Sequence, residues 1–340
     1  MNTENKTSVY FIAEIGGNHE GDFSLAKDLL NQAIECGVDA VKFQAYTGDG
    51  IANRLVDPDR VKHFNRFTLS LDDHIELAEI CLKRNVDYMA SVWNEEMLSQ
   101  LVPYMRFVKV GSGDLTNYKF FEILSSYQKP IILSTGIADI QEVEAAVSMI
   151  EKFYSSCDLG NLNHHILQCT SMYPIEFSDA NLNVMGTYKN LFPNYEVGYS
   201  DHTVGTTAIQ VAIAMGARTI EAHFTDKSIK SDFRDHIVSK TADDFRELIK
   251  FSDQVRDLQG SYEKSLLGIE KINGHDKSFR RSIYLNKYLP KGATIKPEDV
   301  VILRPLSGIP ASQYYELIGK KLARDINALE ILQWSDILND

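Results

Sequence analysis

The chain has 340 residues, of which 44% are hydrophobic and 24% charged, and this composition is typical of a soluble globular protein with one large domain and a small second one. The formal net charge of −12 argues against nucleic acid as the main partner, although a few lysines on one rim can still bind a small anion. No apolar run approaches the ~20 residues that span a bilayer, and the polar start MNTENKTS lacks a signal region, so we expect a cytoplasmic protein.

Short apolar segments alternate with amphipathic segments along the first 260 residues. The predicted strands cover residues 9–14, 39–45, 86–92, 106–114, 129–136, 164–171, 196–200 and 218–224. The predicted helices cover residues 23–37, 71–85, 117–128, 139–154, 206–215 and 241–260. Eight strands, nearly all followed by a helix, predict a (β/α)8 TIM barrel of α/β class, and the missing GxGxxG turn argues against a dinucleotide-binding sheet.

The longest irregular stretch runs from residue 47 to about residue 71, directly after the second predicted strand. Loops of this length in compact domains are usually functional, and its position places it over the carboxyl ends of the strands. We therefore expect it to cover a substrate.

Beyond the barrel segment 1–260, periodicity falls away over residues 261–278, which we interpret as a linker to a β-rich module at residues 279–340. Within that module, YLPKGATIKPEDV at 288–300 is echoed by DINALEILQWSDI at 325–337. Leu329 stands in the second copy where the first has Gly292. The short duplicated unit has a small core and is expected to need a partner surface.

Two histidines follow neighbouring predicted strands, His202 in Ser-Asp-His-Thr and His223 in Glu-Ala-His-Phe. The carboxyl ends of parallel strands meet on one rim, so both imidazoles lie there, with Asp201 and Glu221 beside them. They form either half of a divalent-metal site or a pair of hydrogen-bonded core histidines, and the pair alone does not decide between these. The four cysteines have no CxxC spacing and are expected to be reduced thiols: Cys36, Cys81, Cys157 and Cys169.

Two lysines lie inside predicted strands, Lys42 in AVKFQ and Lys109 in KVGSGD. An unpaired buried ammonium group is costly, so these lysines indicate an anionic ligand. Four serines at different strand ends can donate hydrogen bonds to the same anion, although each alone is as compatible with a capped turn: Ser112, Ser134, Ser171 and Ser200.

The motifs AEIGGNHEG, AVKFQ, KVGSGD, PIILSTG, QCTSMYP, GYSDHT and EAHFT occur in this order, and the C-terminal part has RRSIY, LRP and IGKKLARDI. Together they resemble the sialic acid synthase family over nearly all of residues 8–337, including its C-terminal antifreeze-like (SAF) domain. The resemblance implies condensation of phosphoenolpyruvate with an open-chain N-acylated hexosamine and water to a nonulosonic acid and phosphate, with C–O cleavage. It also implies a divalent metal, with Mn2+ first and Mg2+ or Co2+ as alternatives, and a homodimer in which each SAF domain caps the partner's barrel.

The resemblance also assigns roles to residues. His202 and His223 match the metal ligands, and the two lysines and four serines match phosphoenolpyruvate positions. Glu14 matches an essential glutamate, and Glu221 is assigned to catalysis as a partner that orients a ligand or contacts substrate. The sugar-contacting positions are Gln44, Tyr173, Asp235 and Arg304.

One loop departs from the family pattern, because Pro-Gly-Pro-Asp-His is replaced here by residues 231–236, Ser-Asp-Phe-Arg-Asp-His. The bulky Phe233 and the charged Arg234 indicate that the sugar is not necessarily N-acetylmannosamine. A diacetamido-trideoxyhexose is an alternative, and Arg234 either meets a phosphate on the sugar or pairs with an acidic neighbour. Two other functions stay open, a metal-dependent barrel aldolase or isomerase that releases no phosphate, and a non-catalytic sugar-binding protein.

Overall fold

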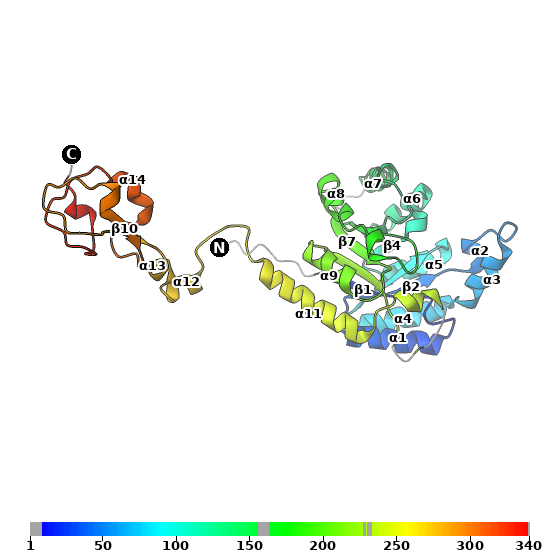
Figure 1. Ribbon diagram of the computed structural model, residues 1–340. Helices are drawn as coiled ribbons and strands as arrows, with labels where there is room; N and C mark the ends of the chain where they lie inside the picture. Colours follow the sequence, from blue (N-terminus) through cyan, green and yellow to red (C-terminus); the bar gives the residue numbers. More distant parts are fainter. Residues whose placement is uncertain (1–8, 156–162, 227–228, 230–232, 339–340) are drawn as a thin grey trace. The chain divides into compact units, whose positions relative to one another are not determined.

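The protein is described by a computed structural model covering residues 9–155, 163–226, 229 and 233–338 (Figure 1). The chain divides into two compact units, residues 1–260 and 261–340. Eight strands make up the sheet of the first unit: β1 (Tyr10–Gly16), β2 (Ala40–Ala45), β3 (Asp87–Val92), β4 (Val108–Val110), β5 (Ile131–Ser134), β6 (His165–Cys169), β7 (Glu196–Asp201) and β8 (Thr219–His223).

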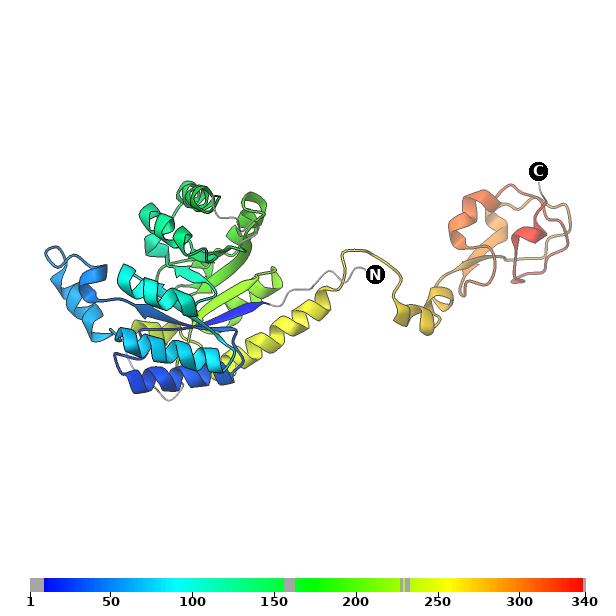
Figure 2. The same ribbon diagram turned by 180° about the vertical axis from the view of Figure 1, so that it is seen from behind.

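The hydrogen-bonded strand pairs described for this sheet are parallel, and the strand order is β3-β2-β1-β8-β7-β6-β5-β4. A parallel bridge between Tyr88 of β3 and Met105, just before β4, brings the two ends of this order together. The sheet therefore closes into the (β/α)8 barrel that the sequence predicted, with the helices on its outside (Figure 2).

The helices of the first unit follow the strands and cover the barrel. They are α1 (Phe23–Glu35), α2 (Gly48–Ile51), α3 (Pro58–Arg66), α4 (Leu71–Lys83), α5 (Glu95–Leu101), α6 (Tyr118–Ser126), α7 (Ile140–Tyr154), α8 (Val184–Leu191), α9 (Thr207–Ala214), α10 (Arg234–Val238) and α11 (Ala242–Gln259). Short 3-10 turns lie at Val102–Tyr104, Ser112–Asp114 and Phe177–Asp179. No helix in the described part of the chain is long and apolar enough to cross a membrane.

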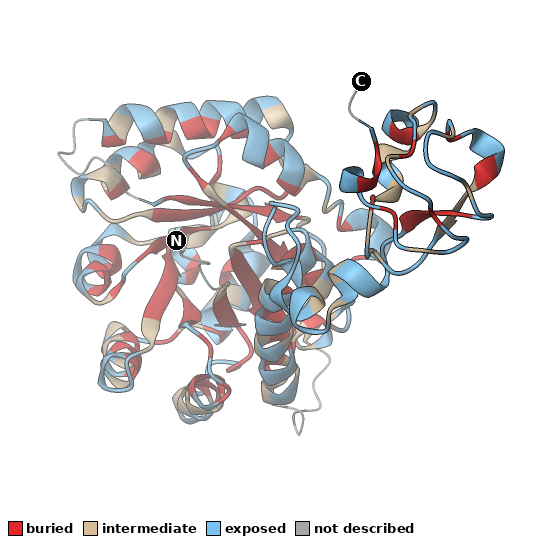
Figure 3. Ribbon diagram, turned by 90° about the vertical axis from the view of Figure 1, so that its left-hand side faces the viewer, coloured by how far each residue is buried: buried red, intermediate tan, exposed pale blue. Residues whose placement is uncertain are grey.

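The core lies between the barrel and its helices. Figure 3 shows the strands almost wholly buried, while the helices are buried along one side and exposed along the other. Helix α7 illustrates the cause, because its buried residues recur every three to four positions and its start is fixed by a capping box between Asp139 and Glu142. A second buried cluster fills the barrel interior and includes Ile12, Met89 and Ile132.

The stretch 47–71, expected to be irregular, contains helices α2 and α3. Their helical signals are local and polar: Thr47 caps α2, while Asp57 caps α3 and Pro58 occupies its first turn. In α3 only Val61 is buried, so the apolar periodicity that marks the other helices is absent.

The second unit pairs β9 (Ser282–Leu285) with β10 (Val300–Leu303) in an antiparallel ribbon. Its helices are α12 (Gly268–Ile272), α13 (His275–Ser278) and α14 (Tyr314–Leu317), and 3-10 turns lie at Pro297–Asp299, Ala311–Gln313 and Trp334–Asp336. Helices α12 and α13 fall within the stretch interpreted as a linker. A separate core includes Ile283, Ile295, Leu322 and Leu332.

The repeat seen in the sequence has a structural counterpart in this unit. Asp299 and Asp336, 37 positions apart, each accept a backbone N–H three residues earlier at the start of a 3-10 turn. Gly292 and Leu329, also 37 apart, both adopt a positive φ, of 82° and 61°. The two copies therefore share turn geometry as well as apolar positions.

Candidate active site

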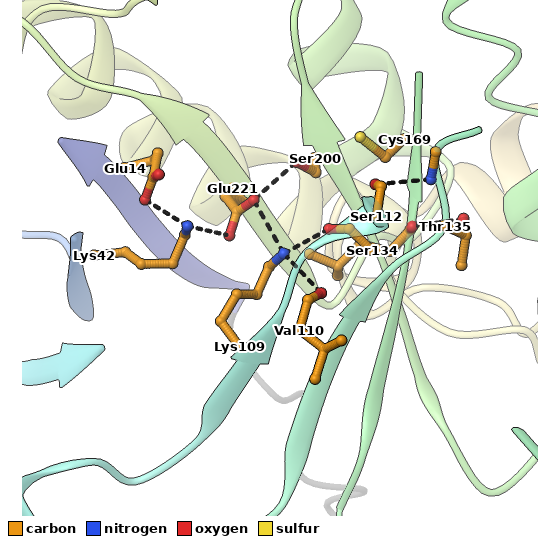
Figure 4. A network of polar contacts seen from close by, with 12 residues as sticks. Glu14, Lys42, Lys109, Val110, Ser112, Ser134, Thr135, Cys169, Ser200 and Glu221 are labelled. Carbon is orange, nitrogen blue, oxygen red and sulfur yellow. Dashed lines mark hydrogen bonds and ion pairs between the residues drawn. The ribbon is translucent and has the colours of Figure 1, made fainter. Parts of the chain in front are cut away.

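A chain of alternating charges lies at the carboxyl ends of β1, β2, β4 and β8 (Figure 4). Lys42 Nζ lies 2.6 Å from Glu14 Oε2 and 3.9 Å from Glu221 Oε2. Lys109 Nζ lies 3.5 Å from Glu221 Oε1 and 2.8 Å from Ser134 Oγ. Contrary to the expectation from the sequence, neither buried lysine is unpaired, because a carboxylate lies beside each.

Burial and pairing oppose each other in setting the protonation of this chain. Burial raises the pKa of Glu221, but Lys109, Lys42 and the Ser200 hydroxyl outweigh it and lower the pKa to about 2. Burial lowers the pKa of Lys42, but Glu14 and Glu221 raise it above its usual value. Burial lowers the pKa of Lys109, and the attraction of Glu221 does not offset this effect. The nearest carboxylate lies 3.5 Å from Lys109, compared with 2.6 Å from Lys42. Glu221 is therefore ionised at neutral pH, and it sits between two cations.

Two of the predicted serines, Ser112 and Ser171, lie beside Gly136, which comes two residues after the end of β5. Its N–H donates to Ser112 Oγ at 2.9 Å. A Cβ atom added to Gly136 would overlap Ser171 Oγ and lie 2.9 Å from Ser112 Oγ. Ser134 accepts a hydrogen bond from Lys109, and Ser200 donates one to Glu221 at 2.9 Å. Three hydroxyl groups and one ammonium group therefore lie at the ends of β4, β5 and β6, and the hydroxyl groups of Ser112 and Ser171 approach residue 136 closely because it has no side chain.

The two histidines lie next to each other at the ends of β7 and β8, with ring centroids 5.5 Å apart. His202 Nδ1 lies 2.7 Å from Thr170 O, and since a carbonyl only accepts, this nitrogen carries the proton and Nε2 keeps a lone pair. His223 Nδ1 is buried without a hydrogen-bond partner in the part of the chain that the structure describes. Tyr173 packs against both rings, at 4.0 Å and 5.6 Å between centroids.

The carboxylates expected beside the histidines have other partners. Asp201 faces Lys240 rather than an imidazole, at 2.8 Å, and Glu221 faces the lysines. Among the described residues, no group of three or more His, Cys, Asp or Glu side chains forms a metal-binding cluster. Any ion held by the histidines would keep several open coordination positions.

The residues expected to contact a sugar lie beside Glu14 and the histidines, except for Arg304. Gln44 Nε2 donates to Glu14 Oε1 at 2.9 Å, and Asp235 Oδ2 lies 3.9 Å from His223 Nδ1. Arg304 belongs to the second unit, where it is exposed and lies over the Phe279 ring, 4.9 Å from its centroid. The structure thus brings the barrel residues together and describes Arg304 only within its own unit.

The unusual loop before α10 contacts the segment 47–71. Residues 231 and 232 of this loop lie outside the described part, but Phe233 stacks on Phe67, with ring centroids 4.8 Å apart, and a Cβ at Gly17 would lie 3.1 Å from its Cζ. Arg234 lies over the Tyr173 ring at 5.0 Å, and its Nε is 3.4 Å from Asp235 Oδ1. Arg234 therefore pairs with its acidic neighbour, one of the two roles expected for it.

Helices α2 and α3 form one wall of a cavity of about 600 Å³ at the ends of β3 and β4. Arg60 and Phe64 line that wall, and Trp93 and Asp114 line the other, joined by a 2.6 Å hydrogen bond from Trp93 Nε1. Gly111 and Gly113, on either side of Ser112, also line it. The segment 47–71 thus lies over the strand ends, where a covering segment was expected.

Two residues of this region escaped the sequence analysis as site residues. Cys169, expected only as a reduced thiol, ends β6 with its Sγ 3.9 Å from His202 Nδ1. Burial raises its pKa, but His202 and Lys109 lower it below the usual value. Lys240 carried no signal, because it follows the last predicted strand in an unremarkable Val-Ser-Lys-Thr. The other described cysteines, Cys36 and Cys81, are buried and free, and Cys157 lies outside the described residues.

Comparisons with known proteins agree with this geometry. Residues 29–264 match the NeuB family, and residues 280–338 match the SAF domain. The N,N'-diacetyllegionaminic acid synthase of Legionella pneumophila is 34% identical over 348 residues, covering 96% of this chain and 94% of the relative. The pseudaminic acid synthase of Campylobacter jejuni is 31% identical over 350 residues, covering 99% and 98%.

A solved structure is similar as well. The N-acetylneuraminic acid (sialic acid) synthetase of Leptospira borgpetersenii, crystallised with citrate, superposes with a TM-score of 0.71 at 27% identity. The match covers 81% of this chain and 95% of that one. These three relatives are named for three different acids, so the similarity does not select one sugar.

Proposed function

The chain belongs to the NeuB family, and from that premise we propose that it condenses phosphoenolpyruvate with an open-chain N-acylated hexosamine to give a nonulosonic acid and phosphate. C3 of phosphoenolpyruvate forms the new bond to the aldehyde carbon, and the aldehyde oxygen takes a proton and becomes a hydroxyl. Water then adds to C2, and phosphate leaves with the bridging oxygen, which generates the 2-keto acid.

The observation that carries this proposal is the group of serine hydroxyls around Gly136 and the neighbouring Lys109 ammonium group, which donates to Ser134. Phosphate and carboxylate oxygens accept strong hydrogen bonds from ammonium and hydroxyl groups. Ser112, Ser134 and Ser171 offer three hydroxyl groups, and Lys109 offers the charge. A sugar aldolase that takes no phosphoenolpyruvate has no use for this anion site.

Glu14 is the proposed proton-handling group, either on the new hydroxyl or on the attacking water. Its Oε1 is fixed by Gln44 and its Oε2 by Lys42, so the carboxylate is held in one orientation at the end of β1. Glu221 forms ion pairs with both Lys42 and Lys109 and accepts a hydrogen bond that orients the Ser200 hydroxyl. Binding the tri-anionic substrate would then require the lysines to exchange carboxylate contacts for phosphate or carboxylate contacts of the ligand.

The two histidines fit a divalent cation. The proton on His202 Nδ1 leaves Nε2 free as a ligand, and the buried, unpartnered Nδ1 of His223 indicates that a group is missing at this place. A bound Mn2+, Mg2+ or Co2+ would act as a Lewis acid on the aldehyde oxygen. Chelation by EDTA should abolish turnover, and His223→Ala should remove Mn2+ binding in calorimetry. Full activity in excess chelator would contradict this assignment.

Gln44, Tyr173 and Asp235 are proposed to contact the sugar. Phe233 closes this side of the site with an apolar surface against Phe67, in contrast to the Pro-Gly of the family pattern. Such a surface suits a 6-deoxy diacetamido sugar at least as well as N-acetylmannosamine. We also propose a homodimer in which Arg304 of one chain completes the other chain's site, on the strength of the SAF match at residues 280–338.

The decisive experiment measures phosphate release from phosphoenolpyruvate with Mn2+ and a panel of hexosamines. We expect release only when an N-acylated hexosamine is present, with label from the C2 bridging oxygen recovered in phosphate. Ser171→Val should abolish release without unfolding the protein, because Ser171 is not buried. If no sugar of the panel elicits phosphate, the protein is a sugar-binding protein or another barrel enzyme.

A further inference from the structure

A fully buried ion pair joins the segments that carry the two histidines. Asp201 ends β7 and is 0% exposed, and Lys240, in the segment between α10 and α11, is 1% exposed. Lys240 Nζ lies 2.8 Å from Asp201 Oδ2 and donates to Thr203 O and Val238 O, each at 2.7 Å. The ammonium group therefore makes two hydrogen bonds and one ion pair, and it contacts the residues on both sides of His202, Asp201 and Thr203.

The same residue also holds the other histidine through its backbone. Lys240 N donates to His223 O at 2.7 Å, and Thr225 N donates to Lys240 O at 3.0 Å. Lys240 thus adds a short parallel bridge to the end of β8, opposite Phe224. One residue binds β8 with its main chain and β7 with its side chain.

Asp201 completes the arrangement on the β7 side. Its Oδ1 accepts from Tyr199 Oη at 2.9 Å, from Thr203 N at 3.1 Å and from Thr203 Oγ1 at 2.9 Å. The backbone on both sides of His202 is therefore fixed by one carboxylate, whose position depends in turn on Lys240. The ion pairs of the lysine–glutamate chain in the site join Glu14, Lys42, Lys109 and Glu221 and involve neither Asp201 nor Lys240.

We propose that Lys240 is a positioning residue that sets the distance and orientation of the His202 and His223 imidazoles through Asp201 and the backbone of β8. This inference deepens the proposed function, because the two imidazoles are the proposed cation ligands. Lys240 contacts both neighbours of His202, Asp201 and Thr203, and also the backbone carbonyl of His223. An ion pair that only stabilised the fold would not need contacts with both histidine segments. Partners that orient metal-binding histidines typically change metal affinity 10–100-fold when they are removed.

Lys240→Met keeps the length of the side chain but removes its charge, its ion pair with Asp201 and its two hydrogen bonds. We expect it to weaken Mn2+ binding, measured by calorimetry without substrates, by at least about tenfold. The double variant Lys240→Met/Asp201→Asn removes the unpaired charge as well, so it should recover part of the lost thermal stability but none of the Mn2+ affinity. Recovery of Mn2+ affinity together with stability would overturn the proposal, because the pair would then be only structural.

A second readout does not depend on metal. In the metal-free protein labelled with 15N-histidine, the signals of His202 and His223, assigned with His202→Gln and His223→Gln, should shift or broaden in Lys240→Met. Tyr10→Phe is the control, because it loses a partly buried hydrogen bond to Asp87 at the amino end of the barrel. It should change stability but neither the imidazole signals nor Mn2+ affinity.

The outcomes separate the two proposals. If the natural chain binds no Mn2+, the metal part of the proposed function is wrong, and the imidazole signals of Lys240→Met still test the positioning role. Unchanged signals for both histidines in Lys240→Met would refute that role, whether or not the protein binds metal.

Discussion

Replacing Glu221 by Gln tests the central charge arrangement of the barrel. The substitution keeps the shape of the side chain and an oxygen for the Ser200 hydroxyl, but it removes the charge between Lys42 and Lys109. The carboxylate is buried, and its pKa is lowered from 4.5 to about 2. The ionised form of Glu221 is therefore more stable in the folded protein than in the unfolded chain. Glu221→Gln should therefore destabilise the barrel at neutral pH.

The size of the effect follows from the lowered pKa of Glu221. Each pKa unit corresponds to about 1.4 kcal/mol, so the ionised carboxylate contributes about 3 kcal/mol to the free energy of unfolding at pH 7. Because the folded pKa is the lower one, this contribution is complete above the unfolded pKa and is lost as the pH falls toward the folded pKa. At pH 3.5 it should have decreased to about 2 kcal/mol, and near pH 2 it should almost vanish.

Urea unfolding followed by Trp fluorescence measures this difference. The chain has two tryptophans, Trp93 in the barrel and Trp334 in the second unit, so a Trp334→Phe background makes the signal report on the barrel alone. With a slope of about 3 kcal/mol per molar urea, the midpoint of Glu221→Gln should fall by roughly 1 M at pH 7 and by less at pH 3.5.

Glu122→Gln is the control, because Glu122 pairs with Lys119 at 2.8 Å on an exposed helix surface, and it should leave the midpoint nearly unchanged. A loss below about 1 kcal/mol at pH 7, or a loss that is the same at both pH values, would refute the account of Glu221 as an ionised group held between two lysines.

Three further outcomes test the proposed site. Lys109→Met should raise the KM for phosphoenolpyruvate at least about tenfold with a smaller effect on the sugar, since charge-assisted bonds to phosphate are the strong ones; a rise confined to the KM for sugar would show the roles to be reversed. Replacing residues 231–236 by a Pro-Gly-Pro-type loop, which removes Phe233 and Arg234, should change the ratio of kcat/KM between hexosamines, and an unchanged ratio would exclude the loop from sugar choice. Mixing inactive His223→Ala and Arg304→Ala chains should restore activity to about a quarter of all sites if Arg304 acts on the partner chain, whereas no recovery after verified subunit exchange would reject that arrangement.

The barrel could be predicted because its strands are buried on both faces and therefore form continuous apolar runs. Helices that are short or bury few residues could not. Helix α5 depends on an Asn94 cap whose side chain accepts from Met97 N, and α3 depends on Asp57 and Pro58. Such polar start signals are common in loops too, so they do not identify a helix without its apolar face.

The positions of site residues at strand ends could be predicted from the sequence. Contacts with residues from the loops could not. Residues at strand ends meet on one rim in any parallel barrel, which is why Glu14 and His223 could be expected near each other. The contacts of Asp201 with Lys240 and of Phe233 with Phe67 join residues far apart in the sequence, across loops whose course no periodicity encodes. For the same reason the sequence did not reveal that Asp201 pairs with Lys240.

The two copies of the repeat in the second unit adopt the same positive-φ conformation, although only one of them has a glycine there. Glycine adopts a positive φ freely at position 292, whereas Leu329 pays about 1–2 kcal/mol for the equivalent conformation 37 positions later. Each copy anchors the same turn with a basic residue on its aspartate, Lys287 on Asp299 and Arg324 on Asp336, both at 2.6 Å. The two copies therefore share both a positive-φ position and an ion pair on the following 3-10 turn, although the residues at positions 292 and 329 differ.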